Sequence, residues 1–102
     1  MKMSYPVIFT ETEKAILVEI PDFVILTEGK DIGNAVDMAR DAIYTAIASK
    51  IIHNDLIPTP RKIDEIIIEN GTFYNEGNSN ISMIDVDVKR RACYESYTRK
   101  NS

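Results

Sequence analysis

Carboxylate side chains are the strongest candidates for chemistry in this chain of 102 residues. Asp85 and Asp87 alternate along one strand-like segment, so both point to the same side of it. With Asp22 or Glu19 from a neighbouring strand they would form a carboxylate cluster, which could hold a divalent cation for phosphoester hydrolysis. The same alternation is typical of the solvated face of an antiparallel sheet, and this is our leading interpretation.

The single histidine and the single cysteine lack the partners that catalysis requires. His53 falls at the expected end of a helix, where the dipole favours its charged form and predicts a capping role. Cys93 lies in a basic stretch, but no base is evident to activate its thiol. A zinc site would have to depend on carboxylates. Phosphate-binding glycine loops and the nucleophile elbow are also missing from the sequence. We therefore expect no catalytic residue, no metal site, no cofactor and no enzymatic activity.

The charge distribution favours a basic protein as the partner. Residues 1–80 contain seven basic and thirteen acidic side chains, a net charge of −6, whereas residues 81–102 contain five and three, a net charge of +2. Binding nucleic acid requires Lys and Arg side chains that neutralise phosphates. The acidic body is therefore expected to repel nucleic acid and to attract a basic protein. The basic stretch KRRACYESYTRK is expected to be solvated surface.

The composition predicts one globular domain. Hydrophobic residues make up 44% of the chain and charged residues 27%. No apolar run reaches the roughly 20 residues of a membrane helix, and the first residues do not resemble a signal peptide. One cysteine cannot form an internal disulfide, which is typical of a reducing compartment. These features predict a cytoplasmic protein without membrane contact.

Three short strands, a long helix and a final strand are predicted to position the side chains discussed above. Apolar residues recur every three or four positions from residue 32 to 53, which predicts a helix with Asp31 as its N-cap. Residues 63–69 are too short to assign by period and fit either a helical turn or a strand. Residues 70–80 are polar and predict a loop. The strands are expected at residues 5–10, 15–20, 23–27 and 81–88.

This order, β-β-β-α-β, predicts an α+β fold. The connections between the first three strands are short, which favours antiparallel neighbours. The simplest packing places the long helix on one face of a small, mainly antiparallel sheet.

Several segments together resemble the N-terminal domain of the HicB-type antitoxins. The opening YPVIFTETEKAILVEIPDF is similar to the first two strands of the family and ends in its Pro-Asp-aromatic corner. Family members usually carry Pro-Gly after this corner, whereas Val24 and Ile25 follow here, so the turn is expected to differ. The further matching motifs are Thr27-Glu28-Gly29, Asp31, Ala35-Val36, residues 39–43, Ile57-Pro58-Thr59-Pro60 and Ile84-Asp85-Val86-Asp87-Val88.

The resemblance implies a partial ribonuclease-H-like fold without nuclease activity. It implies a toxin-binding domain in residues 1–90, followed in residues 91–102 by a tail or the start of a linker to a DNA-binding domain. The implied partner is a small, basic, mRNA-cleaving toxin of the HicA type, neutralised sterically, with no direct nucleic-acid binding by this chain. We expect toxin contacts near the corner and the helix start, where acidic side chains flank an aromatic one. The expected contacts are Asp22, Phe23, Glu28 and Asp31, with a core position as the alternative for Phe23.

Two other functions stay open from the sequence. The first is a divergent metal-dependent nuclease that uses Asp85, Asp87 and a third carboxylate. The second is a self-associating regulatory module without a toxin. A homo-oligomer is also expected for an antitoxin of this kind, because an open sheet has unpaired edges.

Overall fold

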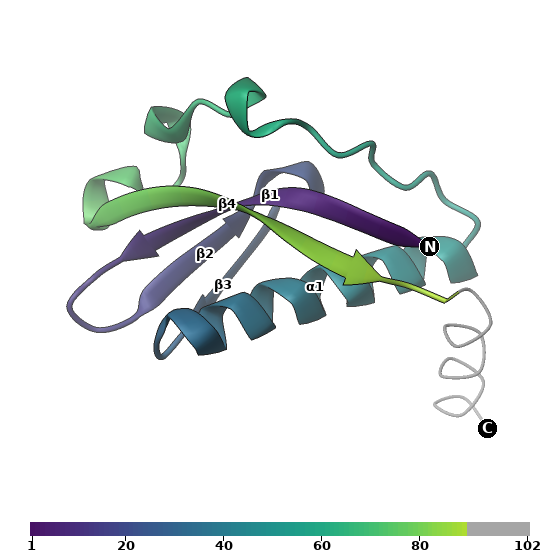
Figure 1. Cartoon of the computed structure of the whole chain (residues 1–102), viewed down its shortest axis with the longest axis horizontal. Helices are drawn as coiled ribbons and strands as arrows, with labels where there is room; N and C mark the ends of the chain where they lie inside the picture. Colours follow the sequence, from purple (N-terminus) through teal and green to yellow (C-terminus); the bar gives the residue numbers. More distant parts are fainter. Residues whose placement is uncertain (90–102) are drawn as a thin grey trace.

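A computed structural model describes residues 1–89 as a four-stranded antiparallel sheet with one long helix (Figure 1). The strands lie in the order β3-β2-β1-β4, so β1 and β2 are central and β3 and β4 form the edges. This confirms the α+β fold and the β-β-β-α-β order. The tail at residues 91–102 and Cys93 lie outside the described residues. The elements are β1 (Lys2–Glu11), β2 (Ile16–Ile20), β3 (Ile25–Gly29), α1 (Ile32–Ile52) and β4 (Asn78–Asp87).

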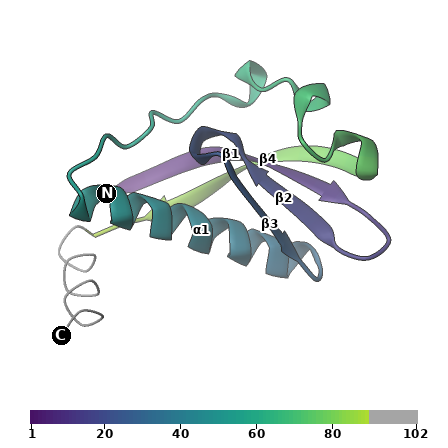
Figure 2. The same cartoon turned by 180° about the vertical axis from the view of Figure 1, so that it is seen from behind.

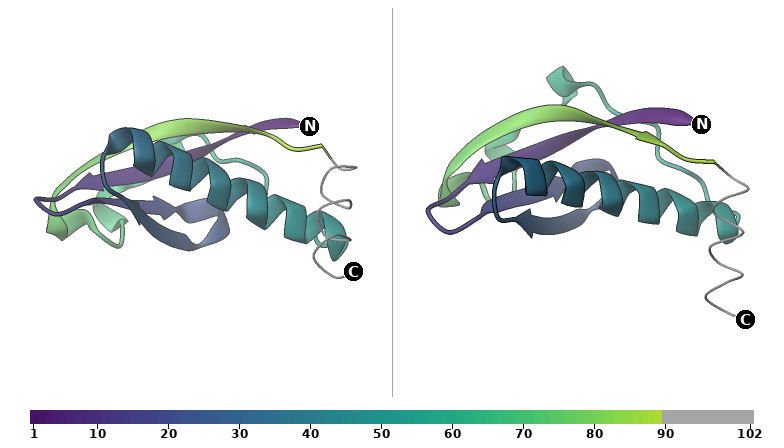
Figure 3. Two further views of the ribbon diagram at one scale, coloured as in Figure 1. Left: turned by 90° about the horizontal axis from the view of Figure 1, so that it is seen from below. Right: turned by 60° about the horizontal axis from the view of Figure 1, so that its bottom comes forward.

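The sheet is covered on both faces. Helix α1 packs across one face, and the long segment between α1 and β4 crosses the other (Figures 1 and 2). This crossing segment, residues 53–77, contains three short 3-10 turns. They are η2 (Ile63–Glu65), η3 (Ile68–Asn70) and η4 (Tyr74–Glu76), and all three contact β4. The views from below show α1 running obliquely under the strands (Figure 3).

The core lies between α1 and the sheet. Alternate residues of the strands point toward the helix, because strand side chains alternate between the two faces. The helix contributes a buried residue about once per turn, as its apolar period predicts. Ile32, at the start of this predicted face, is exposed, and Ala35 packs against the sheet instead. The buried members are Tyr5, Val7, Phe9, Ile16, Val18, Ile20, Ala35, Ala39, Ile43, Ile47, Ile51, Ile84, Val86 and Val88.

The start of α1 is fixed by a side-chain cap and a close approach to β3. The Asp31 carboxylate accepts a hydrogen bond from the Asn34 N–H at 2.8 Å, which confirms the predicted N-cap. Just before it, Gly29 lies so close to Ala35 that a Cβ built on Gly29 would be 2.5 Å from the Ala35 backbone. No larger residue fits between β3 and α1 at this point.

Several strand boundaries differ from the prediction, and the first strand begins at Lys2 rather than residue 5. The third strand begins at Ile25 rather than residue 23, because Pro21–Phe23 forms a 3-10 turn, η1, and Val24 adopts a left-handed conformation with φ 54°. The last strand begins at Asn78 rather than residue 81, since β1 pairs with it over ten residues, from Lys2–Asp87 to Glu11–Asn78. Residues 63–69, for which the sequence left a helical turn or a strand open, contain the turn η2 and the first two residues of η3 and no strand.

Among the helices within residues 1–89, none has the length and hydrophobicity to cross a bilayer.

Candidate functional site

Asp22, the first expected contact residue, is held inside the fold by Arg61. Arg61 donates from Nε to Asp22 Oδ1 at 2.6 Å, and its backbone N–H donates to Oδ2 at 3.1 Å. The Asp22 side chain is only 5% exposed. This ion pair joins the turn η1 to the crossing segment, so the Asp22 charge is already balanced by a cation of the same chain.

Phe23 packs against the core. Its ring meets Tyr5 edge to face, with ring centroids 4.8 Å apart, and it is half-buried. The Tyr5 hydroxyl donates to the Pro58 carbonyl at 2.7 Å, which ties the crossing segment to the central strand. Burial, reinforced by the nearby Asp22 charge, raises the pKa of Tyr5 to about 12. The alternative of a core position for Phe23 therefore fits its surroundings.

Glu28 and Asp31 lie at the other end of β3. Both are exposed, and Asp31 serves as the N-cap of α1. Glu28 is the fourth residue of β3, so roughly 15 Å of mostly extended chain separates it from Phe23. The structure therefore divides the four expected contacts into two pairs instead of bringing them together.

Glu28 lies instead in a group of exposed glutamates that the sequence analysis did not identify. A shallow depression brings Glu28 together with Glu13 from the β1–β2 turn and Glu76 from η4. We call these three residues the acidic patch. Lys14 also lines the depression, so the patch has an excess of negative charge. Its members come from three distant stretches of the chain, and no local motif signals their proximity.

An apolar stripe adjoins the acidic patch. Leu26 and Glu28 alternate and therefore share one face of the edge strand β3, and Val24 lies in the turn just before this strand. Val24 is 90% exposed and Leu26 is 52% exposed, and Leu17 lies directly opposite Glu28 in the register. This arrangement of exposed apolar side chains beside carboxylates suits protein binding, since interfaces combine an apolar centre with a polar rim.

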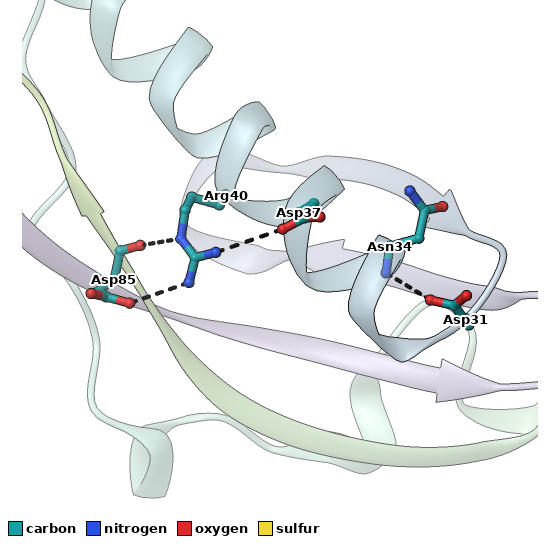
Figure 4. Close-up of polar contacts among 5 residues, drawn as sticks. All are labelled: Asp31, Asn34, Asp37, Arg40 and Asp85. Atoms are coloured by element: carbon teal, nitrogen blue, oxygen red, sulfur yellow. Dashed lines mark hydrogen bonds and ion pairs between the residues drawn. The ribbon is translucent and has the colours of Figure 1, made fainter.

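The carboxylates of the nuclease hypothesis do not form a cluster. Asp85 pairs with Arg40, Nη2 to Oδ1 at 3.3 Å, on the outer edge of β4 (Figure 4). Asp87 lies 3.5 Å from the N-terminal amine. Glu19 lies on β2, two strands away from β4, and accepts hydrogen bonds from Thr72 of the crossing segment. Within residues 1–89, no group of three His, Cys, Asp or Glu side chains is arranged to hold a metal ion. His53 caps α1, with Nδ1 2.8 Å from the Ser49 carbonyl oxygen.

Several solved structures share this architecture. No family model and no curated protein sequence matches the chain. A chain of the toxin–antitoxin complex from Streptococcus pneumoniae superimposes with a TM-score of 0.74 and 25% identity, covering 94% of this chain and 73% of that one. The crystal structure of the Burkholderia pseudomallei antitoxin HicB superimposes with a TM-score of 0.65 and 17% identity, covering 97% of this chain and 84% of that one. This chain has the fold of the HicB antitoxins.

A third match supports the same assignment of the HicB fold. A chain of the HicA3 and HicB3 toxin–antitoxin complex superimposes with a TM-score of 0.61 and 19% identity, covering 85% of this chain and 99% of that one. The three matches cover 94%, 97% and 85% of this chain, so the likeness is one of overall architecture.

Proposed function

We propose that this chain is an antitoxin that binds a small, basic, RNA-cleaving toxin of the HicA type and sterically covers its catalytic surface. The observation that carries the proposal is the likeness to a chain of the Streptococcus pneumoniae toxin–antitoxin complex over 94% of this chain. An mRNA-cleaving toxin meets its substrate in the cytoplasm, so we propose that the pair acts there. The mechanism requires binding only and no catalytic residue of this chain.

The acidic patch and the apolar stripe are the proposed contact surface. A toxin that binds RNA must present Lys and Arg side chains to phosphates. Glu13, Glu28 and Glu76 offer carboxylates to the same side chains, while Val24 and Leu26 supply exposed apolar area beside them. A toxin bound here would lose access to RNA, because its phosphate-binding groups would face the glutamates.

The four contacts expected from the sequence have different roles in this proposal. Glu28 lies in the acidic patch and Asp31 is exposed three residues further along the chain, so both are proposed as direct contacts. Asp22 and Phe23 are engaged by Arg61 and Tyr5, and we propose that they position the corner from which Val24 projects.

The first test isolates the partner. The full chain is immobilised and lysate of its source cell is applied at low salt, then eluted by rising salt. We expect a small basic protein that cleaves RNA when free and does not cleave it when bound to this chain. Retention of no such protein by the folded chain would contradict the proposal.

The second test maps the surface by charge reversal. In the triple variant E13K/E28K/E76K we expect at least about tenfold weaker binding of the toxin. The matched control D41K/D55K/D64K changes net charge equally at exposed acids outside the patch, and we expect less than about a threefold effect. Equal losses in both variants would show that net charge, rather than this surface, governs binding.

A further inference from the structure

The backbone of β4 has one side bonded to β1 and one side facing outward. At the end of the ladder, Val88 donates to the Met1 carbonyl at 2.7 Å and accepts from the Met1 amine at 2.9 Å, so Val88 faces β1. In an antiparallel pair this orientation alternates residue by residue. Even-numbered residues of β4 therefore face β1, and odd-numbered residues present their N–H and C=O groups outward.

Arg40 occupies one of these outward groups. It reaches from α1 around the edge of the sheet and donates from Nε to the Asp85 carbonyl at 2.9 Å, while its Nη2 pairs with the Asp85 carboxylate (Figure 4). This contact confirms independently that Asp85 faces outward. Arg40 thus closes the edge at Asp85.

The rest of this edge is open. The outward backbone groups of Ser79, Ile81 and Met83 have no hydrogen-bond partner among residues 1–89. We call these three residues the open edge. Natural sheets protect such edges with charged side chains, proline or bulges. Residues 78–84, with the sequence NSNISMI, contain neither charge nor proline, and their pairing with β1 is continuous.

We propose that the open edge pairs antiparallel with the same edge of a second copy, which joins two four-stranded sheets into one continuous sheet. The absence of charge in residues 78–84 favours a second copy over a basic partner at this edge. A basic partner gains no electrostatic attraction at this neutral segment. Two copies with a net charge of −4 each repel least where neither carries a carboxylate.

The positions of the open groups define one register. A two-fold axis at Ile81 pairs Ile81 with its equivalent and Ser79 with Met83 of the second copy, which uses every group of the open edge. The next pair outward would need the Asp85 carbonyl, which Arg40 already holds. The same register places Asn80 opposite Ser82 of the second copy in a non-hydrogen-bonded pair, where side chains lie closest.

Exposed apolar side chains near β4 would be covered by the second copy. Met83 belongs to the open edge and is 40% exposed. The turns η2 and η3 contact β4 on the face opposite α1. Ile63 in η2 and Ile67, which directly precedes η3, are both exposed. Burial of such side chains adds hydrophobic stabilisation to the backbone hydrogen bonds.

The test compares two double variants of the full chain by sedimentation velocity over a wide concentration range. In the proposed register, N80K/S82K places Lys opposite Lys twice, whereas N80K/S82E places Lys opposite Glu twice. Both positions are exposed in the single copy, so both variants are expected to fold. We expect the wild type and N80K/S82E to dimerise, and N80K/S82K to dimerise at least about tenfold more weakly than N80K/S82E.

Amide hydrogen exchange supplies an independent measurement. We expect the N–H groups of Ser79, Ile81 and Met83 to become protected as the wild-type dimer forms. A wild type that stays monomeric overturns the proposal, and protected outward amides in that monomer would assign the edge to the chain's own residues 90–102. A dimer that responds equally to both double variants also overturns it. Toxin binding at the acidic patch is measured separately on the same variants, so failure here leaves the antitoxin proposal standing.

Discussion

Val24 holds a backbone conformation that its side chain disfavours. Its φ of 54° lies in the left-handed region, which costs an L-residue about 1–2 kcal/mol, and β-branched residues are rare there. The residue is almost fully exposed, so no packing contact of the side chain offsets this cost. Its N–H nevertheless bonds the Pro21 carbonyl at 3.2 Å and closes the turn before β3.

We expect Val24→Gly to raise the free energy of unfolding by roughly 0.5–1 kcal/mol, because glycine adopts positive φ freely but loses more entropy on folding. Urea unfolding measures the change. Val24→Asn should also raise the free energy of unfolding, because asparagine tolerates this conformation. Destabilisation by both substitutions would show that the valine side chain stabilises the corner. The same Val24→Gly variant should bind the proposed toxin more weakly, since it shortens the apolar stripe.

Tyr5 links stability to alkaline pH. Its pKa is raised to about 12 from an ordinary value of 10.0, so between these values the unfolded chain loses the phenolic proton while the folded chain keeps it. The folded state then binds more protons, and stability falls as pH rises. Tyr5→Phe removes this loss and, at neutral pH, also removes the hydrogen bond to Pro58.

We therefore expect the wild type to lose about 2 kcal/mol of unfolding free energy between pH 10 and pH 12 beyond any loss in Tyr5→Phe. At pH 7 the variant should be less stable by about 1 kcal/mol. Urea unfolding at several pH values measures both quantities. Parallel pH profiles of the two proteins would contradict the assignment to Tyr5.

At the scale of the elements, two glycines near the start of α1 have opposite roles. Gly29 lies where β3 meets the helix, and a Cβ there would overlap the Ala35 backbone. Gly33 lies in the first turn of α1, and its Cβ would meet only Asp31 Oδ1, at an ordinary 3.5 Å.

We expect Gly29→Ala to destabilise the fold by about 2–3 kcal/mol, because the helix must move away from β3. Gly33→Ala should stabilise it by about 0.5–1 kcal/mol, since alanine favours the helix. Thermal and urea unfolding of the two variants make this comparison. Similar effects of both substitutions would show that glycine flexibility matters more here than the contact between β3 and α1.

The order of the elements was predictable because each has a clear period. The alternation in β4 and the apolar repeat of α1 are local patterns that survive in the fold. The limits of β3 and β4 were not predictable to the residue. Val24 changes the chain direction through an unfavourable conformation, and the polar residues at the start of β4 become strand only because β1 lies beside them.

The contact surface was predictable only in part. Glu28 was identified from its place near the helix start, and it lies in the acidic patch. Glu13 and Glu76 join it through the β1–β2 turn and the end of the crossing segment, and such tertiary proximity leaves no pattern in the sequence. The sequence favours Asp22 because it is an acidic residue beside the aromatic one at the corner. The structure pairs its charge with Arg61, whose position depends on the tertiary fold.

For the whole molecule, the charge distribution predicts how the proposed complex forms. Opposite net charges raise the rate of encounter, and salt screens them over about 8–10 Å at physiological strength. We expect the association rate with the toxin to fall at least about tenfold between 50 and 500 mM salt, while the dissociation rate changes much less. Stopped-flow kinetics measure both rates, and E13K/E28K/E76K should flatten the dependence. An association rate that does not change with salt concentration would contradict electrostatic steering.

The ladder between β1 and β4 joins the two ends of the described chain, and this sets a time order for folding. Strand β1 ends at Glu11, but its ten-residue partner begins only at Asn78 and is synthesised later. At roughly 5–20 residues per second, the ribosome needs on the order of 3–13 s to make the chain between them. Throughout that interval one side of β1 has no strand beside it. Under the proposed function, a message cut anywhere before the codons of β4 yields no folded antitoxin, so cleavage by the toxin would stop production of the protein that restrains it.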